Sequence, residues 1–134
     1  MDIEVFTLCD AATDSGGKLN LLGAFDSIFT KSLPAVHPQC AIALRLRFSR
    51  IEAGKHKIKI SLIDADGKPV VAPFDAEMNV AFKGGEASLA ANVIMNLQRL
   101  QVREEGEYSI DLAIDGRHEK SVPLLVKVAA QKKN

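Results

Sequence analysis

The sequence predicts an all-β fold, an antiparallel two-sheet β-sandwich of about eight strands, and three observations lead to it. Apolar and polar residues alternate along most of the chain, which is the period of a half-buried strand. Turn-forming glycine, proline and aspartate separate these segments at intervals of roughly 8 to 15 residues. The 134 residues, 47% of them hydrophobic, can bury one core. We therefore expect residues 1–134 to form a single domain.

The N-terminal part predicts two strands and a loop. In the first strand, four residues share one side: Ile3, Val5, Thr7 and Cys9. A second strand is expected from Lys18 to about Thr30, with Gly23 as a bulge or bend. Pro34 and Pro38 then bracket a loop.

Two strands with the clearest alternation follow, over 41–49 and 55–64. Their inward residues are Ile42, Leu44, Leu46 and Phe48 in the first strand, and Ile58, Ile60 and Leu62 in the second. The next strand begins after the turn at Asp64-Ala65-Asp66-Gly67 and runs to Phe82. It directs Phe74, Ala76, Met78, Val80 and Phe82 inward.

The segment 86–103 fits both a strand and a helix. Leu89, Val93, Leu97 and Leu100 have helical spacing, and Ala, Leu, Gln and Arg favour a helix. We favour a strand over 88–98 because its neighbours are strands. Its outward side would then carry a mildly apolar patch of Ala90, Ile94 and Asn96, a candidate contact surface.

The last two strands are expected over 107–114 and 119–128. The first directs Tyr108, Ile110, Leu112 and Ile114 inward. Asp115-Gly116 between them is a hairpin turn signal, and Pro123 indicates an edge position or a bulge. The basic tail 129–134 is expected to fray.

The residues around the single tyrosine resemble the corner before strand F of immunoglobulin-like domains. The resemblance rests on 96–100 and on Glu105-Gly106-Glu107-Tyr108. In those domains the tyrosine hydroxyl bonds back to upstream backbone and fixes the corner. Here Ile110 stands in place of the second framework cysteine, and there is no tryptophan. The resemblance implies an immunoglobulin-like architecture and carries no function.

The N-terminal stretch looks like that of a family of small bacterial proteins of unknown function. The matching residues are Leu8-Cys9-Asp10, Gly17-Lys18-Leu19-Asn20-Leu21-Leu22-Gly23-Ala24-Phe25-Asp26, Pro34 and Gly106-Glu107-Tyr108. The resemblance implies a bacterial origin and a sandwich domain over nearly the whole chain. It brings no activity, ligand or catalytic residue to transfer.

The segment 45–59 is the most strongly charged part of the chain. It holds six Lys or Arg residues and a single acid, Glu52. If its two strands paired as a hairpin, like charges would lie opposite each other, Arg47 near Lys57 and Arg45 near Lys59. Such pairs are destabilising, so the arrangement of this segment must relieve them.

Three arrangements would relieve this repulsion. Glu107 and Asp111 on a neighbouring strand could interleave with the cations, or the two strands could lie in different sheets. An anionic partner is the third arrangement. It makes a candidate anion-binding set of Arg45, Arg47, Lys57 and Lys59.

No residue pattern indicates catalysis, a cofactor or a metal. Cys9 and Cys40 lack a CxxC spacing, so we expect small buried hydrophobes, with a disulfide as the alternative. His37, His56 and His118 have no zinc-ligand spacing. Asp64-Ala65-Asp66-Gly67 lacks the later ligands of a calcium loop and is expected to be a plain turn.

Composition and the N-terminus restrict location and partners. Lys and Arg number 17, as do Asp and Glu, and aromatic residues make up 5%. Nucleic acid is therefore not expected as a partner. The start has no basic n-region, and no stretch approaches the length of a membrane span. We expect a cytoplasmic protein without a membrane partner.

The leading functional hypothesis is a non-catalytic interaction module that acts through protein–protein contacts, with a second copy of itself as a candidate partner. The alternative is a small-anion or phosphate-ligand binding protein that uses the basic face around residues 45–59. An enzyme is the third hypothesis. It would need a cleft that brings His37 or His56 near Cys9 or Cys40.

Overall fold

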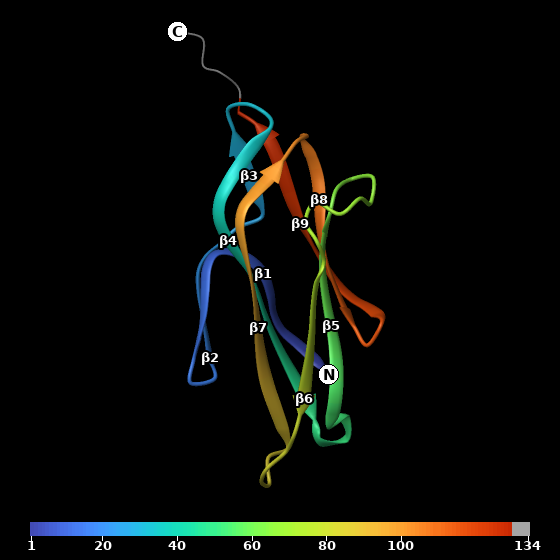
Figure 1. Cartoon of the computed structure of the whole chain (residues 1–134). Helices are drawn as coiled ribbons and strands as arrows, with labels where there is room; N and C mark the ends of the chain where they lie inside the picture. Colours follow the sequence, from blue (N-terminus) through green and yellow to red (C-terminus); the bar gives the residue numbers. More distant parts are fainter. Residues whose placement is uncertain (130–134) are drawn as a thin grey trace.

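The computed structural model describes residues 1–129, which form nine strands and one short 3-10 helix (Figure 1). The elements are β1 (Asp2–Ser15), β2 (Lys18–Ala24), β3 (Ser27–Thr30), β4 (Ala35–Ser49), η1 (Arg50–Glu52), β5 (Gly54–Ile63), β6 (Phe74–Val80), β7 (Ser88–Val102), β8 (Gly106–Ile114) and β9 (Arg117–Val128). The expected all-β class is confirmed. The tail 129–134 was predicted to fray, and its residues 130–134 lie outside the described residues.

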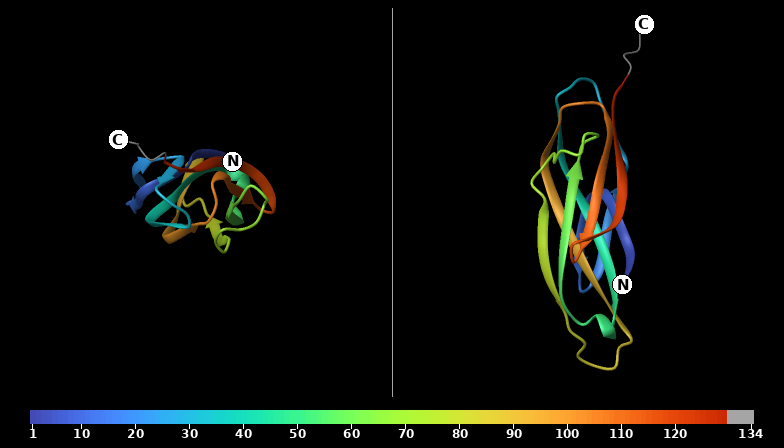
Figure 2. Two further views of the ribbon diagram at one scale, coloured as in Figure 1. Left: turned by 90° about the horizontal axis from the view of Figure 1, so that it is seen from above. Right: turned by 90° about the vertical axis from the view of Figure 1, so that its right-hand side faces the viewer.

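The strands form two sheets that enclose one core. Sheet A has four strands in the order β2-β1-β4-β7, and sheet B has five in the order β3-β9-β8-β5-β6. Sheet B curls around the core, and the molecule is elongated along the direction of its strands (Figure 2). The largest fully buried side chains come from both sheets, among them Leu44 and Phe48 of β4 and Ile60 and Leu112 of β5 and β8.

The count of nine strands, where eight were expected, comes from the segment Lys18–Thr30. Gly23 has a φ of +66°, and soon after it the chain leaves sheet A and enters sheet B. The expected single strand is therefore two strands, β2 and β3. β3 pairs with β9 in parallel, so the expectation of purely antiparallel sheets is wrong at this edge.

The expected loop around Pro34 and Pro38 is shorter than predicted, because β4 begins at Ala35. β1 pairs with β4 only from Ala41 onward, so Pro38 lies where β4 has a neighbour on one side only. Opposite it on β7, Arg99 has a φ of +54°, and this pair alone is missing from a register that is the same on both sides. Proline is tolerated there because no partner strand needs its missing N–H.

Segment 86–103, which fitted both a strand and a helix, contains the strand β7. This strand pairs with β4 along its whole length. β6 ends at Val80, two residues before the predicted end at Phe82. Pro123 lies on the part of β9 that β3 does not reach, which confirms the expected edge position.

The predicted inward faces are confirmed in β4, β5, β6, β7 and β8 but not in β1. There Phe6 and Leu8 join the core, and Cys9 lies on the outer face. The pairing of β1 with β4 shifts between Ile3 and Val5. This bulge changes which residues point inward further along the strand.

The β1–β2 hairpin folds back over the outer face of sheet A. β1 pairs with β4 up to Cys9 and with β2 from there on. The hairpin covers a small-residue cluster of Cys9, Ala41 and Ala43, all fully buried. These short side chains let a second layer of backbone come close to the sheet.

Candidate interaction surface

The structure divides the four predicted anion-binding residues between the two sheets. Arg45 and Arg47 lie on the outer face of β4 in sheet A, and Lys57 and Lys59 on the outer face of β5 in sheet B. The helix η1 carries the chain from one sheet to the other. Of the three arrangements that could relieve the repulsion, separation into different sheets is therefore present.

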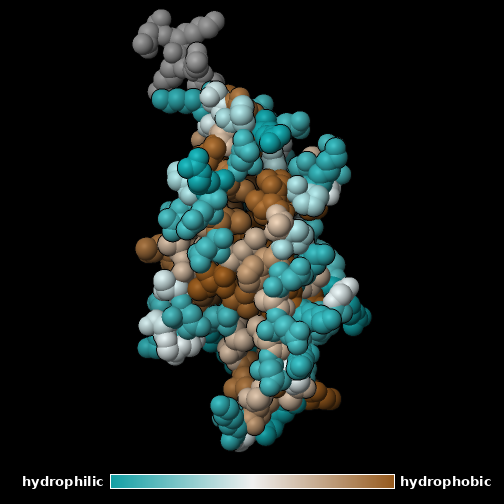
Figure 3. Space-filling model, in the orientation of Figure 1, coloured by the Kyte–Doolittle hydropathy of each residue, from teal (hydrophilic) through white to brown (hydrophobic). Residues whose placement is uncertain are grey.

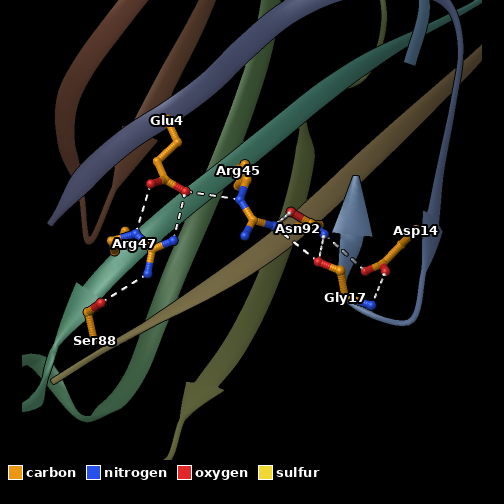
Figure 4. Close-up of polar contacts among 7 residues, drawn as sticks. All are labelled: Glu4, Asp14, Gly17, Arg45, Arg47, Ser88 and Asn92. Atoms are coloured by element: carbon orange, nitrogen blue, oxygen red, sulfur yellow. Dashed lines mark hydrogen bonds and ion pairs between the residues drawn. The ribbon is translucent and has the colours of Figure 1, made fainter. Parts of the chain in front are cut away.

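Arg45 and Arg47 share one carboxylate, that of Glu4 (Figure 4). Arg45 Nε donates to Glu4 Oε1 at 2.9 Å, and Arg47 Nε donates to Glu4 Oε2 at 2.8 Å. The ion pairs lower the pKa of Glu4, with the hydrogen bond from Arg47 as the largest cause, and raise the pKa of Arg47. Glu4 was not predicted from the sequence, because only the pairing of β1 with β4 brings it beside these arginines.

Further donors of both guanidinium groups bind other parts of the chain. Arg45 Nη1 donates to the carbonyl of Gly17 and to Asn92 Oδ1, at 3.1 and 2.9 Å. Arg47 Nη1 donates to Ser88 Oγ at 2.9 Å. Asn92 Nδ2 also donates to Gly17, at 3.2 Å. This network attaches the hairpin tip to β4 and β7, so most of the arginine donors are already used (Figure 4).

Lys57 and Lys59 face acids on the neighbouring strand β6. Lys57 lies directly opposite Glu77, and Lys59 directly opposite Asp75. Glu107 and Asp111, which could have interleaved with the cations, do not lie directly opposite these lysines. Asp111 lies opposite Ser61 and accepts hydrogen bonds from Ser109 and Ser121. Opposite charges on paired strands stabilise modestly.

His56 joins η1 and β5 to the β8–β9 turn. Its Nδ1 lies 2.7 Å from Asp115 Oδ2, and its Nε2 lies 2.6 Å from the carbonyl oxygen of Glu52. Two acceptors favour the imidazolium, which has two N–H donors. They raise the pKa of His56, with the Glu52 carbonyl as the larger cause. The ring also stacks on Phe48, so this cluster has a structural explanation.

Both cysteines are free and buried. Cys9 belongs to the small-residue cluster and Cys40 to the main core. Burial raises the pKa of both thiols, that of Cys40 to about 11, so they are poor nucleophiles. His37 lies against the ring of Phe25, and His118 contacts Ser121. Within residues 1–129, no group of three His, Cys, Asp or Glu side chains could hold a metal ion.

The edge strands of the two sheets differ in their protection against pairing. The outermost strands are β2 and β7 in sheet A, and β3 and β6 in sheet B. β6 carries Asp75 and Glu77, and β3 has only 4 residues. β2 is 7 residues long and contains Lys18 and Gly23. β7 has 15 residues, and its one charged residue is Arg99.

The predicted patch on β7 is only partly accessible. Asn96 is exposed, whereas Ile94 is half-buried and packs against the small-residue cluster. Ala90 lies beside Arg47 on the paired strand β4. The accessible part of β7 is therefore its backbone edge more than its outer face.

An apolar groove runs beside the first half of β7, where the two sheets open. Its lining includes the polar residues Asn79 and Lys83 at one side and the apolar side chains Phe48, Met78, Val80, Leu89 and Ala91. Figure 3 shows hydrophobic residues gathered along the middle of this face, where Figure 1 places β7. Residues 88–94 are all half-buried.

The chain belongs to a family of unknown function, DUF6941, whose model matches residues 4–127. The expectation of an uncharacterised family is thus confirmed. No curated protein matches the sequence. Within the described residues, no helix is long and apolar enough to cross a membrane.

Two kinds of solved structure resemble the fold weakly. The Pseudomonas fluorescens alkylpurine DNA glycosylase AlkC is 8% identical, with a TM-score of 0.46 over 75% of this chain and 27% of that one. A Listeria innocua beta-glucosidase is 14% identical, with a TM-score of 0.46 over 92% of this chain and 16% of that one. The chain therefore spans about a quarter and a sixth of these proteins.

Proposed function

We propose that this chain is a non-catalytic interaction module with an immunoglobulin-like β-sandwich architecture. It would bind a protein partner by adding an extended, uncharged segment of that partner to the edge of β7. Backbone hydrogen bonds along the edge would supply affinity, and the apolar groove beside β7 would accept alternate side chains of the partner.

One observation carries the proposal: β7 is the longest outer strand and carries a single charge. Natural sheets protect their edges with charged residues, proline, bulges or short strands. β2, β3 and β6 each have such a device, whereas residues 88–98 of β7 have none. An unprotected edge of this length favours pairing with another strand.

The corner before β8 supports the architectural part of the proposal. Tyr108 Oη donates to the carbonyl oxygen of Glu104 at 2.7 Å. The tyrosine of immunoglobulin-like domains makes the same type of contact with upstream backbone. Non-catalytic action is favoured because the cationic strands face carboxylates and both thiols are buried with raised pKa values.

The experiment uses short synthetic peptides and amide hydrogen exchange. The probe is a capped peptide of about ten uncharged β-forming residues, N-methylated along one edge so that it cannot stack on itself. A matched control peptide carries lysine at alternate positions. We expect the uncharged probe to slow exchange in β7 and leave β6 unaffected, because Asp75 and Glu77 protect that edge.

The lysine peptide should bind β7 far less, since its ammonium groups would lose water beside an uncharged edge and an apolar groove. Equal slowing at β6 and β7, or no slowing at β7 with excess probe, would contradict the proposal.

A further inference from the structure

We infer that the strand received by β7 is β7 of a second copy, paired antiparallel about a two-fold axis at Val93. This inference rests on the proposed function and names its partner. The two sheets A, each of four strands, would join into one continuous sheet. Such isologous dimers are the commonest symmetric assemblies.

Symmetry restricts the register of this pairing. A two-fold axis perpendicular to the sheet keeps outer faces together, so residues directly opposite each other must share a face. The axis must therefore pass through a residue paired with its own copy. Val93 is such a residue, and the axis there lies near the middle of the uncharged run 87–98.

The charges that flank this run restrict the axis to Asn92 or Val93. Glu86 precedes the run, Arg99 follows it, and both are exposed. With the axis at Val93, Glu86 of each copy lies near Arg99 of the other, at both ends of the pairing. An axis at Asn92 would bring these opposite charges equally close, whereas any larger shift along the strand would separate them at both ends. Charge complementarity thus favours a second copy as the partner.

The inner faces favour Val93 over Asn92, because an axis at Asn92 would leave Leu97 opposite Ala87, which precedes β7. With the axis at Val93, Leu89 lies opposite Leu97 of the second copy, and Ala91 lies opposite Met95. Val93 meets its own copy. Leu97 and Met95 are already nearly buried in the single chain, whereas Leu89, Ala91 and Val93 are half-buried. The second copy would extend the core over this half-buried part and exclude water from the groove.

The test uses four double variants of the outer face. In the inferred register, Ala90 lies opposite Asn96 of the second copy, twice per dimer. The like-charge variants are Ala90→Lys/Asn96→Lys and Ala90→Glu/Asn96→Glu. The opposite-charge variants are Ala90→Lys/Asn96→Glu and Ala90→Glu/Asn96→Lys. Each variant carries two charged residues, so edge protection is matched between the pairs.

Sedimentation velocity over a range of concentrations measures dimerisation of the full chain and its variants. We expect wild type to dimerise, and the opposite-charge pair to dimerise at least roughly tenfold more tightly than the like-charge pair. Charges at position 90 also affect folding of the single chain, since Arg47 lies opposite. The dimerisation free energies are averaged over the two like-charge variants and over the two opposite-charge variants. Each average contains one Lys and one Glu at position 90, so the effect of Arg47 on the single chain cancels. Thermal unfolding checks that each variant is folded.

Three outcomes separate the inference from the proposed function. A wild-type chain that remains monomeric overturns the inference, whereas peptide binding at β7 would still support strand addition. Dimerisation with equal constants in all four variants overturns the register and the two-fold pairing. If amide exchange at β7 is slowed in the dimer and the opposite-charge variants dimerise more tightly than the like-charge variants, both the inference and the proposed function are supported.

Discussion

The two halves of the basic segment 45–59 lie on opposite outer faces and neutralise their charge in different ways. On sheet A, two arginines share Glu4 and also hold the hairpin tip through Gly17. On sheet B, two lysines lie beside the acids of β6, where an ion pair joins Lys55 and Glu77 at 3.7 Å. The first arrangement is a connected network, and the second consists of exposed pairs.

This difference shows why the type of cation matters. The planar guanidinium group offers several fixed donors, so one arginine can bind a carboxylate, a carbonyl and an amide together. The ammonium group of lysine is strongly hydrated and sits on a flexible stem. Arginine therefore serves where a hairpin must be attached, and lysine where solubility of an open face is needed. We expect sheet A to be sensitive to substitution on its outer face and sheet B to tolerate it.

The largest expected difference between the two faces comes from added volume. Ala43→Leu places a branched side chain beneath the hairpin, where Ala43 is fully buried. We expect a loss of about 1–3 kcal/mol in the free energy of unfolding, because the closed hairpin cannot move away without losing its contacts. Lys59→Leu on sheet B is the control, with an expected change within about 0.5 kcal/mol. Urea unfolding measures both, and equal losses would contradict the contrast.

A second prediction concerns His56, which lies where the chain crosses between the two faces. His56→Gln should cost roughly 1–2 kcal/mol at mildly acidic pH, because the imidazolium donates to two acceptors. The folded-state pKa of His56 is raised above 6.5. Its stabilisation is thus fully present below pH 6.5 and is lost as pH rises through the folded pKa.

Urea unfolding across this pH range, with wild type and the variant side by side, provides the measurement for His56. The difference in stability should shrink toward alkaline pH. A difference that grows with pH would show that His56 is neutral in the folded chain. An NMR titration of the ring protons gives the folded-state pKa directly.

The sequence predicted strand faces far better than the path of the chain between sheets. In β4 and β5, alternation is unbroken, and the inward residues Ile42 and Ile60 were assigned correctly. In β1, the bulge between Ile3 and Val5 shifts the alternation, and hydropathy does not record a bulge. The move from β2 to β3 after Gly23 is likewise set by tertiary packing.

The candidate site was harder to predict than the fold. The basic segment 45–59 was identified from the sequence, but its division between two sheets and its neutralising acids on β1 and β6 were not. Glu4 lies 41 residues from Arg45, and the pairing of β1 with β4 within sheet A brings them together. The edge position of β7 follows from strand order, which periodicity cannot give. The neighbouring patch residue Asn96 was identified, whereas the backbone edge was not.

A third and smaller effect is expected from the carboxylate that joins the two arginines. Glu4→Gln should destabilise the chain less than Ala43→Leu, because the Glu4 side chain is 32% exposed to solvent. The folded-state pKa of Glu4 lies below 4.5. Its stabilisation is therefore present above pH 4.5 and is lost as pH falls through the folded pKa.

Acid unfolding of wild type and Glu4→Gln tests this sign, with Glu77→Gln as the matched control on sheet B. The Glu4 difference should disappear at low pH, and Glu77→Gln should change stability by less than about 0.5 kcal/mol. An equal effect of both variants would remove the distinction between a connected network and exposed pairs.

The smallest expected effect concerns anions. Because Glu4, Gly17, Asn92 and Ser88 occupy the arginine donors of sheet A, inorganic phosphate should not raise the melting temperature more than an equal ionic strength of chloride. The lysines of sheet B face Asp75 and Glu77, so all four candidate anion-binding residues lie beside acids of the chain itself. A phosphate-specific increase that Arg45→Gln removes would instead assign anion binding to sheet A. The same increase removed by Lys57→Gln would assign it to sheet B, and either result would show that internal pairing does not exclude an external anion.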